Sequence, residues 1–74
     1  MALIEILAPV ERRHPKKHEP VEAGFQIFEV GGQTYLQIVT YGTSERQIKG
    51  VVSQTIQFGP DGIAALRDVL KTLP

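Results

Sequence analysis

Two runs in the second half of the chain alternate apolar with polar residues, and a helical pattern follows them. The runs cover residues 33–41 and 51–58 and are rich in Val, Ile, Thr and Tyr. Such alternation is typical of β-strands with one buried face. In residues 60–73 the apolar residues instead recur every three or four positions, which predicts an amphipathic helix. The order strand, strand, helix indicates an α+β fold.

The ends of this helix carry sequence signals. Pro60 suits the first helical turn, and Gly59 before it can serve as the N-cap. Asp61 and Lys71 match the positive and negative ends of the helix dipole. The apolar stripe consists of Ile63, Leu66, Leu70 and Leu73. We expect it to cover a sheet face that carries Leu36, Ile38, Ile56 and Phe58.

Two further strands are expected earlier in the chain. Residues 24–30 alternate, and the Gly31-Gly32 pair after them predicts a two-residue hairpin, because glycine accepts positive φ without steric cost. Residues 2–8 predict a first strand, and its apolar residues on both faces suggest a mostly buried strand or a subunit contact. We therefore predict a single domain over residues 1–74, with an antiparallel sheet of three or four strands and a C-terminal helix packed across one face.

Two polar segments are expected to be loops. Residues 9–22 contain three prolines and many charges, which predicts a long connector. Residues 42–50 are polar and bracketed by glycines, which predicts a mobile hairpin loop or a continuation of both strands beyond the sheet. His14 and His18 could form a metal pair only if the connector folded around them, since Pro15 opposes a helix there. We expect no metal site and no cofactor.

The length of the chain favours self-association. With 74 residues and no cysteine, the core is thin and disulfides cannot reinforce it. One short helix also cannot cover two apolar sheet faces, so we predict a homodimer. The candidates for its shared surface are Leu3, Leu7, Phe25, Phe28 and Val39. The N-terminal apolar run is too short for a signal sequence or a membrane span, so the expected compartment is the cytoplasm.

Polar and aromatic residues alternate onto the sheet face opposite the helix. That face is expected to carry Tyr35, Gln37, Tyr41, Ser53, Thr55 and Gln57. Tyrosine can stack on bases, and amides can bond to base edges, which suits single-stranded nucleic acid. The alternatives are an ordinary solvated face or a dimer interface through the tyrosines. Phosphates could be contacted by Arg12, Arg13, Lys16, Lys17, Arg46 and Lys49, which alternatively only keep their loops soluble.

Catalysis is not expected from this sequence. A hydrolase or transferase needs a nucleophile, a base and a stabilising group held together. Ser53 has no histidine nearby in the sequence, and no acid–base pair has catalytic spacing. The balance of eight basic and eight acidic side chains also differs from that of a strongly basic nucleic-acid binder.

The last strand and helix carry a family resemblance. With Ile-Lys-Gly at 48–50 and Phe-Gly-Pro-Asp-Gly-Ile-Ala-Ala-Leu at 58–66, the chain resembles the small single-stranded-DNA-binding coactivator domain of the positive-cofactor-four type. Whirly-like and PUR-like modules share that fold, and the resemblance covers residues 24–73. It implies a curved antiparallel sheet and a helix in a dimer, with nucleic acid over the sheet and loops. Residues 35–58 also resemble small uncharacterised bacterial proteins, which imply no activity.

Two functions therefore remain open on the sequence. The first is non-catalytic binding of single-stranded DNA or RNA, in which tyrosines 35 and 41 stack on bases, Gln37 contacts base edges and the six cations contact phosphates. The alternative is a protein-interaction or accessory subunit, antitoxin-like for example, that adds a strand to a partner's edge without nucleic acid.

Overall fold

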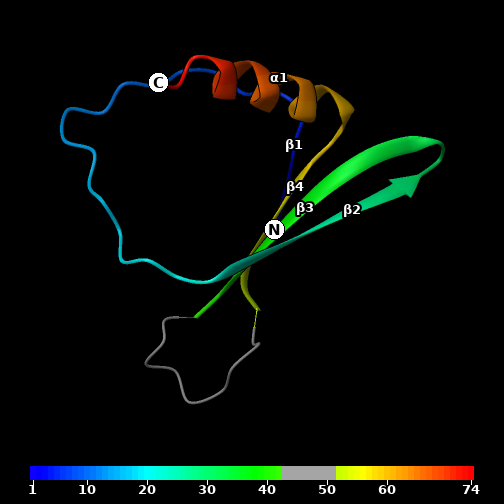
Figure 1. Ribbon diagram of the computed structural model, residues 1–74, viewed down its shortest axis with the longest axis horizontal. Coiled ribbons are helices and arrows are strands. Elements are labelled where there is room, and N and C mark those ends of the chain that lie inside the picture. Colours follow the sequence, from blue (N-terminus) through cyan, green and yellow to red (C-terminus); the bar gives the residue numbers. More distant parts are fainter. Residues whose placement is uncertain (43–51) are drawn as a thin grey trace.

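The chain forms a four-stranded open sheet with one C-terminal helix packed across it, so the predicted α+β class is confirmed (Figure 1). The computed structural model describes residues 1–42 and 52–74. Its elements are β1 (Ala2–Ile4), β2 (Ala23–Val30), β3 (Gln33–Tyr41), β4 (Val52–Phe58) and α1 (Pro60–Lys71). The strand order across the sheet is β1-β4-β3-β2.

The sheet is mixed, so the prediction of a purely antiparallel sheet is wrong at one edge. β1 runs parallel to β4, whereas β2, β3 and β4 are antiparallel neighbours. A parallel pair needs a long connection, and the one from β1 to β4 includes β2, β3 and residues 5–22, which carry the chain from the end of β1 to the start of β2. The first strand, expected over 2–8, is also shorter. Its partner β4 ends at Phe58, opposite Ile4, and the chain then enters α1 at Pro60. The Gly59 N–H donates to the Ile4 carbonyl oxygen at 3.1 Å.

The turn between β2 and β3 is the two-residue hairpin that the glycine pair predicts. Gly31 and Gly32 have φ of 60° and 77°, and Val30 lies opposite Gln33. Positive φ at both central residues is the turn geometry whose twist matches that of the flanking strands. This turn fixes the register of the hairpin, and with it which side chains share a face.

Side chains opposite one another in register lie on the same side of the sheet, and this divides the sheet into two faces. We call one of them the apolar face. Two rows cross it, Ala2–Ile56–Ile38–Phe25 and Ile4–Phe58–Leu36–Ile27. The other is the tyrosine face, which carries Leu3, Gly24, Gln26, Phe28, Tyr35, Gln37, Val39, Tyr41, Thr55 and Gln57. The expected dimer residues are thus divided: Phe25 is on the apolar face, Leu3, Phe28 and Val39 are on the tyrosine face, and Leu7 is on neither.

The helix packs on the apolar face over β3 and β4. Gly59 is its N-cap residue and Pro60 lies in its first turn, as the sequence indicates. Gly62 is buried, and a Cβ at this position would lie 3.5 Å from the Phe58 Cβ. Among the described residues, Phe58 is the one large apolar side chain that is buried, at 8% exposure.

Burial falls steeply from β4 toward the edge strand β2. In the same row as buried Phe58, Ile27 is 64% exposed, and Phe25 in the next row is 75% exposed. Leu70 and Leu73, toward the C-terminal end of the helical stripe, are also more than half exposed. The helix therefore covers one half of the apolar face and leaves the β2 half open.

The connector over residues 5–22, which we call the arm, stands away from the sheet on the side of the helix (Figure 1). It contains no helix or strand, and all of its residues are exposed. The Cα radius of gyration is 14.5 Å, compared with roughly 11 Å for a compact chain of this length. A single copy is therefore more expanded than a packed domain.

Candidate functional site

An aromatic pair lies at the hairpin end of the tyrosine face. Tyr35 on β3 and Phe28 on β2 are opposite in register, and their rings are stacked with centroids 5.5 Å apart and planes 15° apart. Cross-strand aromatic pairs of this kind stabilise the hairpin. The stack occupies one face of the Tyr35 ring, so a base could stack only on the other.

A row of glutamines crosses the middle of this face. Gln26, Gln37 and Gln57 are neighbours on β2, β3 and β4. The Gln57 Nε2 donates to the Gln37 Oε1 at 2.8 Å, in a partly buried position. The side chain that sequence reasoning assigns to base edges is thus held by its neighbour, which fixes its orientation and engages its oxygen.

Tyr41 lies at the opposite end of the face, over a glycine. A Cβ on Gly24 would be 3.1 Å from the Tyr41 Oη, so any larger residue would displace the ring by a few tenths of an ångström. A shallow depression of about 170 Å³ lies there, lined by Gly24, Phe25, Gln26, Gln37, Val39 and Tyr41. The Tyr41 N–H also donates to the Glu22 carbonyl oxygen at 2.9 Å, which attaches the end of the arm to β3.

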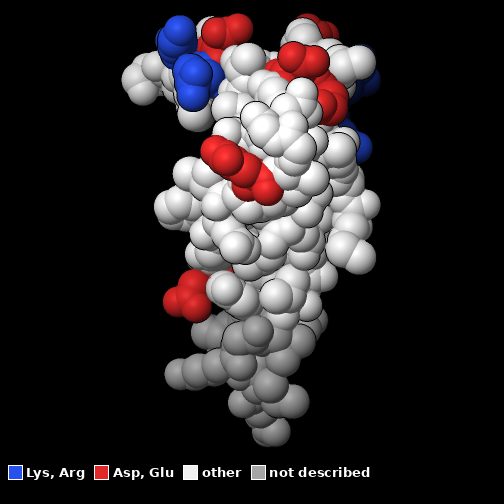
Figure 2. All heavy atoms as spheres, turned by 90° about the vertical axis from the view of Figure 1, so that its right-hand side faces the viewer, with Lys and Arg blue, Asp and Glu red and all other residues white. Residues whose placement is uncertain are grey.

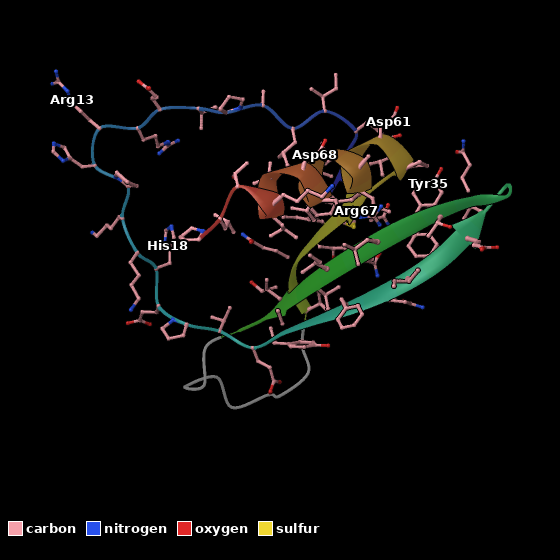
Figure 3. The ribbon with its side chains drawn as sticks, turned by 45° about the horizontal axis from the view of Figure 1, so that its top comes forward. Arg13, His18, Tyr35, Asp61, Arg67 and Asp68 are labelled. Atoms are coloured by element: carbon pink, nitrogen blue, oxygen red, sulfur yellow. The ribbon has the colours of Figure 1, made fainter. Side chains whose placement is uncertain are left out.

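Of the cations expected to contact phosphates, the four on the arm are not gathered around these side chains. Arg12, Arg13, Lys16 and Lys17 are exposed on the arm. Arg46 and Lys49 lie outside the described residues. On the side shown in Figure 2, Lys and Arg appear only toward the upper end of the described surface. In Figure 3, Arg13 and Tyr35 lie at opposite ends of the molecule. The structure brings Tyr35, Gln37 and Tyr41 onto one face, and leaves the arm cations apart from it.

Within the described chain, no three His, Cys, Asp or Glu residues gather in a way that could hold a metal ion. His14 and His18 are both exposed on the arm. Residues 1–42 and 52–74 also contain no helix with the length and hydropathy that a membrane span requires.

The apolar face is the larger functional candidate, and the sequence did not identify its open half. The alternation in 24–30 assigns Phe25 and Ile27 to one face of a strand. It does not show how far a twelve-residue helix reaches across four strands. The signal that was available is the mismatch in size, since one helix covers only part of a four-stranded sheet.

No family model, curated protein or solved structure matches this chain.

Proposed function

We propose that this chain is a non-catalytic protein-interaction module that binds another protein chain through the open half of its apolar face. One observation carries the proposal: the accessible surface of a single copy is 6807 Å², whereas a folded monomer of this mass exposes about 4500 Å². Part of the excess is the polar surface of the arm. Another part is the exposed apolar surface of Phe25 and Ile27, which a second chain would remove from water.

The energetics of a single copy support this proposal. Relative to an extended chain, one copy buries about 43% of its surface, whereas small folded domains bury roughly 60%. Since conformational entropy opposes folding in proportion to length, the one large apolar side chain that is buried among the described residues does little to offset it. A partner that binds only the folded chain would add its binding free energy to the stability.

The open half of the face also has the chemistry of a binding surface. Phe25 and Ile27 are adjacent on an edge strand, and burial contributes roughly 1.5–3 kcal/mol for each such side chain. Contiguous exposed apolar residues of this kind mark interaction sites in soluble proteins, unlike scattered single ones. Leu70 adds a further exposed apolar side chain on the helix, at 57% exposure.

The test is the apparent mass at which the chain elutes from an extract of the cells that produce it. Such an extract samples the cytoplasm, which is the expected compartment. Wild type is expected to elute well above its 8.2 kDa mass. Phe25→Ser should shift it to the monomer position or unfold it. Val30→Ser changes an exposed residue on the opposite face of the same strand and should leave elution unchanged. A wild-type chain that is folded and elutes as a monomer in the extract would refute the proposal.

A second candidate, binding of single-stranded DNA or RNA, is favoured by the placement of Tyr35, Gln37 and Tyr41 on one face, away from the helix. Anisotropy of a labelled strand of about 20 nucleotides tests it, at roughly 50 and 200 mM salt. Binding that weakens steeply with salt and is lost in Tyr41→Ala would support it. Absence of binding at low salt would end it, and would leave the protein-interaction proposal untouched.

A further inference from the structure

We infer that the occupant of the apolar face is a second copy of this chain, and that the arm of each copy closes over the other. This inference rests on the proposed function and names its partner. Three features of the structure carry it. They are the half of the apolar face that the helix leaves open, the apolar area exposed on the face and the arm, and the way the arm is attached.

The apolar face is complementary to itself. The helix covers the half near β4, and the half near β2 is open. A two-fold rotation placed near β2 sets the open half of one copy against the open half of the other, with the two helices at opposite ends. Such an isologous contact uses one patch twice, so Phe25 and Ile27 would lie close to their own counterparts. The zero net charge of the chain adds no overall repulsion to this association.

The area of the face alone is too small for a stable dimer. A fully exposed apolar side chain presents roughly 100 Å². Five exposed side chains of the face and helix then present roughly 300 Å² of apolar area in each copy. They are Phe25, Ile27, Ile56, Leu70 and Leu73. If apolar atoms make up about 60% of an interface, this corresponds to about 500 Å² of interface per copy. A standard interface requires about 800 Å² from each partner.

The arm supplies the missing area. Its exposed large apolar side chains are Ile6, Leu7, Val10 and Val21. On the same basis they raise the interface to roughly 900 Å² per copy, which exceeds the requirement. Ile6 and Val10 are 86% and 83% exposed and Leu7 and Val21 are 39% and 45% exposed, on an arm that stands away from the sheet (Figure 1).

The arm is also attached to its own copy at both ends. At its start, the Glu5 Oε1 accepts the Gly62 N–H at 3.3 Å, beside the first turn of the helix. At its end, the Glu22 carbonyl oxygen accepts the Tyr41 N–H at 2.9 Å. Three prolines between these points restrict the backbone, which lowers the entropy lost when the arm is ordered against a partner. An attached, stiffened loop with apolar side chains is suited to enclose a second chain.

The experiment is sedimentation equilibrium of the purified full chain, from about 1 to 100 µM, because dimer stability depends on concentration. Wild type should have twice the 8.2 kDa chain mass. Ile27→Ser should raise the dimer Kd by at least about 30-fold, since each dimer loses two such contacts. For the arm, Val10→Ser should raise Kd about tenfold, because ordering the arm offsets part of its burial.

Val30→Ser is the matched control for both variants. Val30 is 59% exposed on the opposite face of β2, compared with 64% for Ile27 and 83% for Val10. It should change Kd by less than about twofold. Circular dichroism on each variant shows whether a lost dimer is still folded.

The outcomes separate this inference from the proposed function. A folded wild-type monomer at every concentration, together with a larger species in the extract that Phe25→Ser abolishes, refutes the second copy and preserves protein binding. A dimer that responds to Ile27→Ser but not to Val10→Ser refutes the closing arm. A dimer weakened equally by Val30→Ser would overturn the assignment of the interface to the apolar face.

Discussion

Gly62→Ala tests the contact between α1 and β1 most directly, because helix propensity and packing predict opposite signs. In an exposed helix, replacing glycine by alanine stabilises by about 0.5–1 kcal/mol. Here a Cβ would overlap the Ile4 carbonyl oxygen, which is backbone and cannot rotate away. Overpacking of this kind costs about 1–3 kcal/mol. Moving that carbonyl would also break its 3.1 Å bond from the Gly59 N–H, worth about 0.5–1.5 kcal/mol.

We therefore expect a net loss of about 1–3 kcal/mol for Gly62→Ala, or a fall in Tm of roughly 5–20 °C for a domain of this size. The assay is thermal unfolding by circular dichroism at one fixed protein concentration, since association changes Tm. Ala64→Gly, at an exposed position of the same helix, measures how much an exchange between alanine and glycine changes Tm through helix propensity alone. If Gly62→Ala raises Tm by about the amount that Ala64→Gly lowers it, the close approach of α1 to β1 is wrong.

Substitutions at three further positions each test one local feature by urea unfolding. Glu5→Ala should cost about 1 kcal/mol, because the carboxylate accepts a helix N-terminal N–H, and Glu5→Gln should cost less because an amide oxygen still accepts; equal losses would show that the charge, and not the hydrogen bond, carries the stabilisation. Gly31→Val should cost about 1–2 kcal/mol because φ is positive there, whereas Gly31→Asn should cost clearly less; equal costs would show that the turn conformation is not limiting. Gln57→Ala should cost about 1 kcal/mol through its bond to Gln37, and no change would mean that water replaces this bond.

The candidate site was only partly predictable. Alternation places Tyr35, Gln37 and Tyr41 on one face of β3, and the structure agrees, because side chains of a strand point to alternate faces whatever the tertiary fold. Whether the arm cations reach that face depends on the path of an irregular segment, which has no periodicity to read. The structure leaves Arg13 far from Tyr35 (Figure 3).

The sequence by itself determined the local elements of this protein. Two glycines specify the hairpin turn, alternation specifies the two faces of β2, β3 and β4, and the Gly59-Pro60 pair with an apolar stripe specifies where α1 begins and which side it buries. These are short-range effects of backbone sterics and side-chain periodicity.

Tertiary structure alone decided the remaining features. β1 has three residues with apolar side chains on both faces, so nothing local distinguishes a parallel partner from an antiparallel one. The open half of the apolar face depends on where a helix of fixed length lies over a sheet of fixed width. Both are long-range packing outcomes, set by which surfaces meet and not by the preference of any residue for its own conformation.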